Sequence, residues 1–180
     1  MTSRVLMDAC VLYPTVLREI LIGAAERGYF TPLWSPRILE EWARAAAKLG
    51  PEGEAVARGE IAALRAGWAA AEVDYPADVE REILLPDAND AHVLAAAIGG
   101  DADELLTFNL RDFPPRVLGR HGIVLRDPDG FLLELSHQEA GFREVLEGVR
   151  RRTEQISGRE QPLKPLLKRL RLPRLAKAVS

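Results

Sequence analysis

Cysteine and histidine are scarce in this chain of 180 residues, which contains one cysteine and three histidines. A single cysteine, Cys10, excludes an intramolecular disulfide framework and a cysteine-rich zinc site. The histidines, His92, His121 and His137, are scattered without the spacing of metal ligands. Any metal site in this chain would therefore depend mainly on oxygen ligands.

Long apolar runs are also absent. No segment approaches the roughly 18 apolar residues that a membrane span needs. The first ten residues, MTSRVLMDAC, contain no apolar targeting core. With 47% hydrophobic and 28% charged residues, the composition is that of an ordinary globular protein. We therefore expect a cytoplasmic protein without a membrane partner.

The net charge of −3 conceals a division along the chain. Residues 1–142 contain 13 Lys and Arg against 23 Asp and Glu, a net charge of −10, whereas residues 143–180 contain 11 against 4, a net charge of +7. An acidic body repels polyanions, so metal ions or the basic tail would have to bring a phosphate backbone close. The segment LKPLLKRLRLPRLAKAVS, residues 163–180, combines leucines at helical spacing with six basic residues and no acidic one.

Apolar runs alternate with helical periods along the chain. Such alternation predicts an α/β fold with a mostly parallel sheet. Extended segments are expected at 4–8, 29–35, 102–109 and 122–128, and a short strand or connector at 70–76. Helices are expected at 15–27, 37–49, 54–71, 78–84, 90–98, 130–135 and 139–156.

Acidic residues follow several of these strands or open a helix. Asp8 ends the first strand, Asp90 opens the helix at 90–98, and Asn109 with Asp112 follows the strand at 102–109. Sites in open parallel sheets form beyond the carboxyl ends of the strands. Converging carboxylates must share protons or bind cations, and Mg²⁺ or Mn²⁺ suits oxygen ligands. Such a cluster predicts metal-dependent cleavage of a phosphodiester.

Helical periodicity assigns faces to the candidate side chains. Asp90 shares an apolar stripe with Val93 and Leu94, where a carboxylate loses hydration unless a cation or hydrogen bond compensates. His92 falls about 200° from Asp90, so we expect it to be exposed with a structural role. Asp87 is expected to cap the helix and is a further candidate ligand.

Two adjacent glutamates lie in the helix at 37–49. Glu41 borders its buried face, whereas Glu40 points to water, so Glu41 is the candidate site residue. Cys10 is expected to be a small core residue. Thr107 is expected either to be a plain strand residue or to hydrogen-bond a metal-bound water or a phosphate.

Four motifs occur in a fixed order: VLMDACVLYP, WSPRILEEW, PDANDAHVLAAAI and LLTFNLRDFP. Over about residues 4–126, the chain resembles PIN-domain endoribonucleases of the kind that serve as VapC toxins of type II toxin–antitoxin systems. The resemblance implies a three-layer α/β/α fold with a central parallel sheet of about five strands, and metal-dependent cleavage of single-stranded or loop RNA. Asp8, Glu41 and Asp90 match the three principal acidic positions of the family.

The fourth family position differs here, because Asn109 stands where many members have Asp. Asn109 adds no charge, so Asp112, also an acidic position of the motif, would take more of the role of binding a second metal. The expected catalytic residues are Asp8, Glu41, Asp90 and Asp112. The expected ligands of Mg²⁺ or Mn²⁺ are these four with Asn109 and Asp87.

We expect residues 1–130 to form the PIN-like nuclease domain and residues 131–180 a helical, basic C-terminal extension. The resemblance also implies a homodimer and a cognate antitoxin that inserts Arg or Lys among the carboxylates. The basic tail would grip RNA phosphates, cover the antitoxin or extend the dimer; a membrane-surface helix is the least favoured of the four. The alternatives in function are a nuclease for another phosphoester such as flap DNA, and a catalytically weak PIN-like module that binds RNA or protein.

Overall fold

The computed structural model describes residues 1–180 and has a parallel sheet at its centre. The sheet contains four strands in the order β2–β1–β3–β4, fewer than the expected five or so. The strands are β1 (Arg4–Met7), β2 (Thr31–Leu33), β3 (Glu104–Leu106) and β4 (Val124–Arg126). Residues 70–76 contribute only an isolated parallel bridge, between Trp34 and Glu72.

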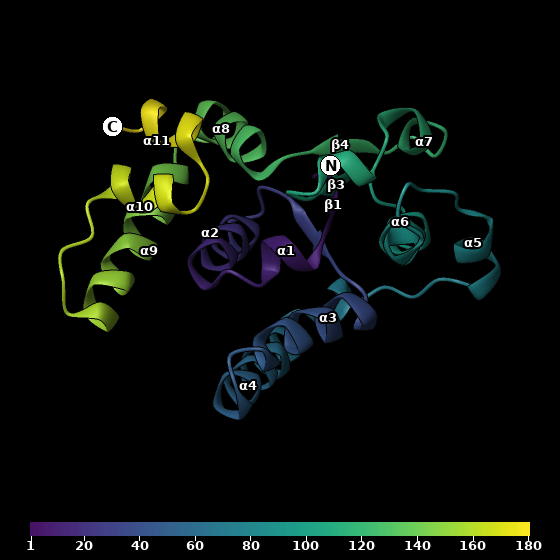
Figure 1. Cartoon of the computed structure of the whole chain (residues 1–180). Helices are drawn as coiled ribbons and strands as arrows, with labels where there is room; N and C mark the ends of the chain where they lie inside the picture. Colours follow the sequence, from purple (N-terminus) through teal and green to yellow (C-terminus); the bar gives the residue numbers. More distant parts are fainter.

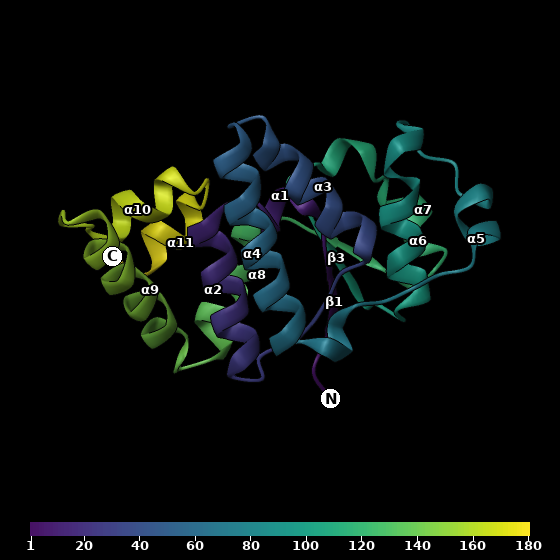
Figure 2. The ribbon, with the colours of Figure 1, turned by 90° about the horizontal axis from the view of Figure 1, so that it is seen from below.

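Helices cover both faces of this sheet. Figure 1 shows α5 and α6 on one side of the strands and α1 and α2 on the other, and the second view in Figure 2 agrees. The expected layered α/β architecture is therefore confirmed. The α-helices are α1 (Ala9–Leu12), α2 (Thr15–Glu26), α3 (Pro36–Ala47), α4 (Pro51–Gly67), α5 (Ala77–Glu82), α6 (Ala91–Gly99), α7 (Pro115–Gly119), α8 (Pro128–Gln138), α9 (Phe142–Ser157), α10 (Leu163–Arg169) and α11 (Pro173–Ala178). Three 3-10 turns are η1 (Ala69–Ala71), η2 (Ala88–Asp90) and η3 (Leu110–Asp112).

The strand β1 occupies the middle of the sheet because its side chains are apolar on both faces. Val5, Leu6 and Met7 are fully buried, as expected for a parallel strand covered by helices on both sides. In the register with β3, Leu6 pairs with Leu105. The carboxyl ends of β1 and β3 therefore lie side by side, and the residues that follow them meet at one edge.

Local chemistry sets the beginning of the helix that carries Glu41. The Ser35 hydroxyl oxygen accepts a hydrogen bond from the backbone N–H of Ile38 at 3.1 Å, and Pro36 is the first residue of α3. The next helix begins at Pro51, three residues before the expected start, because proline suits the first turn of a helix. Gly50, with a φ of 101°, makes the sharp turn between the two helices.

The helix α6 is buried almost all round. Every residue from Ala91 to Ala97 is buried, so the helix has no solvent face that a periodicity argument could locate. The expectation that His92 is exposed is therefore wrong, since its side chain is 0% exposed. Gly99 lets the connector pass closely, because a Cβ there would lie 2.8 Å from that of Tyr75.

The C-terminal helices α8 to α11 extend the same hydrophobic core. Helix α9 lies along α2, and α11 packs on α8 and α10 (Figure 1). Leu167, Leu172 and Leu175 are fully buried and belong to the same apolar cluster as the residues of β1. No helix of the structure combines the length and apolarity that crossing a bilayer requires.

One buried carboxylate fixes the last helix. Asp129, which is 6% exposed, accepts hydrogen bonds from the backbone N–H groups of Arg174 at 3.0 Å and Leu175 at 2.9 Å. These two donors open α11 and have no partner within that helix. Asp129 therefore ties the start of α11 to α8.

We expect Asp129→Ala to lower the free energy of unfolding by about 2 kcal/mol, because it leaves buried N–H groups without an acceptor. Urea unfolding followed by circular dichroism measures this loss. His137→Ala, an exposed position on the same helix, is the matched control and should leave the midpoint unchanged. Equal midpoints for both variants would show that the cap contributes nothing.

Candidate metal centre

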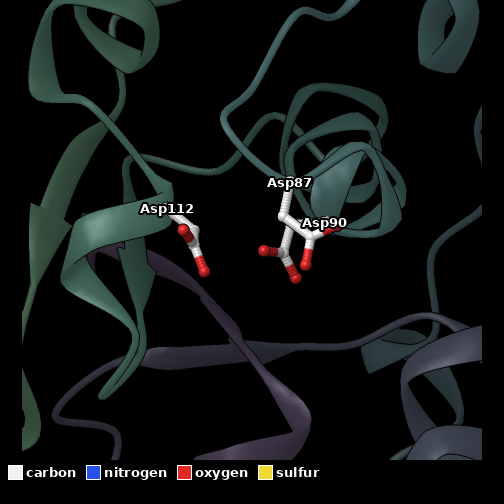
Figure 3. Close-up of side chains that lie close together, drawn as sticks. All are labelled: Asp87, Asp90 and Asp112. Carbon is white, nitrogen blue, oxygen red and sulfur yellow. The ribbon is translucent and has the colours of Figure 1, made fainter.

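Three carboxylates converge between η3 and the start of α6. Oxygens of Asp87, Asp90 and Asp112 lie within 4.8 Å of one another. Figure 3 shows Asp112 facing the other two across a common space. Opposite oxygens are about 4.2 Å apart around six-coordinate Mg²⁺ and about 5 Å apart around Ca²⁺. The spacing of this carboxylate trio (Asp87, Asp90 and Asp112) therefore fits one hard divalent cation.

The chain holds each member of the carboxylate trio by local structure. Asp87 caps η2 by accepting a hydrogen bond from the backbone N–H of Asn89 at 2.9 Å. Asp90 ends η2 where α6 begins. Asp112 ends η3, and Phe113 beside it is fully buried, which anchors this turn to the core. The capping role expected for Asp87 thus coexists with its place in the trio.

The electrostatics of Asp90 connect the trio to two further candidates. Desolvation raises the pKa of Asp90 from 3.8 to about 6, and repulsion from Asp87, Asp8, Asp112 and Glu41 adds to this rise. All four other candidate acids are therefore close enough to disfavour a negative charge on Asp90. A bound cation would reverse this effect by favouring the ionised form.

Asp8 is held rigidly where β1 ends. One of its oxygens accepts a hydrogen bond from the backbone N–H of Ala9 at 2.7 Å, and the other from the Thr107 hydroxyl at 2.9 Å. Burial raises the pKa of Asp8, although both hydrogen bonds act in the opposite direction. Asp8 therefore joins the ends of β1 and β3 and lies beside the trio.

Glu41 points toward the site, and its neighbour Glu40 points away from it. Glu40 forms ion pairs with Arg44 of α3 and with Arg58 of α4. A Glu41 oxygen instead contacts Nε2 of the buried His92, and the Glu41 side chain remains 42% exposed. This close contact lacks hydrogen-bond alignment, since neither ring nitrogen of His92 has an aligned partner.

Asn109 contacts the trio directly. Its side-chain amide donates a hydrogen bond to an Asp90 oxygen at 3.4 Å, and its backbone N–H donates to the Thr107 hydroxyl at 2.9 Å. An aspartate at this position would add another negative charge beside Asp90. Asn109 therefore orients Asp90 and reduces the repulsion in the cluster, while it supplies no charge for a cation.

The sequence matches the profile of the PIN domain over residues 4–111, which is more than half of the chain. This chain belongs to the PIN domain family. No match was found among curated proteins or among solved structures. PIN domains are generally metal-dependent nucleases, and the four-stranded parallel sheet with an acidic edge agrees with this family. The match ends one residue before Asp112 and leaves α7 to α11 outside it.

All six expected site residues lie at one edge of the sheet in this PIN domain, but they do not all belong to one cluster. The carboxylate trio lies within reach of a single cation, and Asn109 bonds to Asp90. Asp8 and Glu41 repel Asp90 from outside the trio. The set expected to hold the principal metal, Asp8 with Glu41 and Asp90, therefore shares only Asp90 with the trio, and it stays a prediction.

Sequence reasoning missed two features of this PIN domain. His92 lies against Glu41, and only its complete burial, which one sequence does not show, distinguishes it from a surface histidine. The Thr107 hydroxyl donates a hydrogen bond to Asp8, whereas the partner expected for it was a metal-bound water or a phosphate. Cys10 is partly buried and packs against the core that it was expected to join, and desolvation raises the pKa of its thiol to about 11, which keeps it protonated at neutral pH.

Proposed function

We propose that this PIN domain is a Mg²⁺- or Mn²⁺-dependent endoribonuclease that cleaves single-stranded or loop RNA. The observation that supports it most is the carboxylate trio, whose oxygens lie within 4.8 Å of one another at the edge of the sheet where Asp8 follows β1. Without histidine or thiolate ligands in the cluster, its chemistry suits hard divalent cations. The choice of RNA comes from the resemblance of the four ordered motifs.

In this proposal the cluster residues have distinct roles. Asp87, Asp90 and Asp112 would hold the ion, and Asn109 would keep Asp90 in position. A divalent cation held by these residues would supply the activation of water for in-line attack at phosphorus and the stabilisation of the charge that develops there. Glu41 contacts His92 through one oxygen, which leaves the other to accept the proton that the attacking water loses. Asp8 holds the ends of β1 and β3 in register.

We further propose that the protein is the toxin of a toxin–antitoxin pair and acts as a homodimer in the cytoplasm. A nuclease of this kind must be silenced in the cell that makes it. An antitoxin with an Arg or Lys placed among the carboxylates would neutralise the charge that repels Asp90 and would exclude the metal. A neighbouring gene for a small DNA-binding protein would support this role, and its absence would favour a solitary RNA-processing nuclease.

The test of the nuclease is cleavage of labelled single-stranded RNA, loop RNA and flap DNA by the purified protein. We expect Mg²⁺-dependent cuts in the two RNAs, complete loss of cutting with EDTA, and recovery with excess Mn²⁺. Flap DNA should remain intact, and preferential cutting of it would reassign the substrate. Calorimetry with Mn²⁺ is the parallel measurement, because a protein without metal affinity would be a binding module and would contradict the proposal.

A further inference from the structure

The basic tail reaches the same edge of the sheet as the carboxylates. Arg171, in the turn between α10 and α11, places its guanidinium carbon 4.4 Å from the centre of the Phe108 ring. Phe108 lies between Thr107, which bonds Asp8, and Asn109, which bonds Asp90. A cation from the end of the chain is therefore fixed on the segment that carries two of the site's hydrogen bonds.

The backbone at Arg171 adopts an unfavourable conformation to make this contact. Its φ of 65° lies in the left-handed region, which costs a residue with a Cβ about 1 kcal/mol. Glycine is the usual residue at such a helix end. The following residue, Leu172, is fully buried and holds the turn in place. An arginine at this position therefore gives up stability, which points to a role for its side chain.

Arg171 and two lysines form an unpaired basic surface. Lys164 and Lys168 are exposed and lie four residues apart on the same side of α10, and Arg171 is exposed in the turn that follows this helix. None of the three forms an ion pair, whereas Arg174 pairs with Asp127. We call these three residues the basic strip. Their charges are free to meet a polyanion that the acidic body repels.

We propose that the basic strip binds the phosphate backbone of single-stranded RNA and that Arg171, stacked on Phe108, guides the strand to the carboxylates. This inference rests on the proposed function, since it describes how the substrate of that site is held. The charges favour RNA over a protein occupant. A protein segment rich in Arg or Lys would meet repulsion from the basic strip, so the strip itself suits RNA better than such a partner.

The test is fluorescence anisotropy of a short fluorescein-labelled single-stranded RNA in EDTA over a range of salt concentrations. The triple variant Lys164→Ala, Lys168→Ala and Arg171→Met removes three charges, and methionine keeps an unbranched side chain against Phe108. We expect about tenfold weaker binding, and a slope of log affinity against log salt that is smaller by about 2, since each phosphate contact contributes about 0.7.

Arg81→Ala is the matched control, because Arg81 is exposed and unpaired on α5, at the opposite end of the molecule from α10 (Figure 1). It should bind RNA like the unmodified protein. Thermal unfolding shows whether the triple variant folds. If the triple variant does not fold, the single variant Lys168→Ala, at an exposed position, replaces it and should give a third of the change in the salt slope. In cleavage assays the triple variant should raise KM.

The outcomes separate this inference from the proposed function. An RNA affinity and salt slope equal to those of the unmodified protein would overturn the basic strip and would leave that face for a protein partner. If the unmodified protein nevertheless cleaves RNA, the nuclease proposal is supported and the proposed role of the basic strip is refuted. Conversely, steep salt-dependent binding that the triple variant loses, without metal-dependent cutting by the unmodified protein, would support the basic strip and refute the nuclease.

Discussion

Asp90→Asn is expected to lower RNA cleavage by about a thousandfold or more, with the circular dichroism spectrum unchanged. Asp90 belongs to the carboxylate trio and bonds to Asn109, so the amide removes one ligand charge and alters the cluster at its centre. Charge stabilisation by a metal provides several kcal/mol in the transition state, and about 4 kcal/mol corresponds to a thousandfold in rate. Single-turnover cleavage of labelled RNA with saturating Mg²⁺ measures the loss.

The same substitution should stabilise the metal-free protein. The raised pKa of Asp90 shows that its ionised form is unfavourable in the folded state. Because the side chain is partly exposed, we expect a gain of only about 1 kcal/mol in the free energy of unfolding at neutral pH. Such a trade between stability and activity is common where a site concentrates like charges.

Glu40→Gln is the control for this variant. It removes a carboxylate from the same acidic protein, at a position that pairs with Arg44 and Arg58 instead of facing the site. Cleavage should remain close to that of the unmodified protein. Full activity of Asp90→Asn would remove Asp90 from the mechanism, whatever its position in the cluster.

The second large effect is a dependence of stability on pH that a divalent ion reverses. The pKa of Asp90 rises from 3.8 to about 6 on folding, and burial raises that of Asp8 as well. Between pH 3.8 and about pH 6, Asp90 holds more bound protons in the folded protein than in the unfolded chain. The contribution of Asp90 to the stability of the metal-free protein therefore falls as the pH rises from about 4 to about 6 and is then constant, and Asp8 acts in the same direction.

A divalent cation binds the ionised carboxylates, so its stabilising effect should grow over the same range of pH. At a concentration of 100 times its dissociation constant, an ion that binds only the folded state adds about 2.7 kcal/mol. Thermal unfolding with EDTA and with Mn²⁺, at about pH 5 and about pH 7, measures both effects. Equal shifts by Mn²⁺ at the two pH values would contradict a site made of carboxylates with raised pKa values.

Much of the fold could be predicted because local chemistry determines it. Ser35 with Pro36 marks the start of α3, and the apolar period beginning at Thr15 marks α2. The strand or connector at 70–76 could not be resolved locally, because pairing depends on a neighbour that the sequence does not specify. His92 was misplaced for a related reason: a helix covered on all sides gives periodicity no solvent face to locate.

The sequence predicted which edge of the sheet holds the site, because Asp8 and Asp112 each come after a strand. Which carboxylates come within reach of one cation did not follow, because the turn η2 and the side-chain torsions of Asp87 and Asp90 decide it. The contact of Arg171 with Phe108 could also not be predicted from the sequence, since it depends on how α8 to α11 pack on one another and how α9 packs on α2.

The pairing of β1 with β3 has a consequence for synthesis of the protein. Asp8 leaves the ribosome before Thr107, its hydrogen-bond partner, which follows 99 residues later in the chain. A nascent chain that still lacks β3 has neither the centre of the sheet nor Asp112. The carboxylate cluster can therefore be assembled only after β3 and η3 have been synthesised, and the contact of Arg171 with Phe108 forms later still.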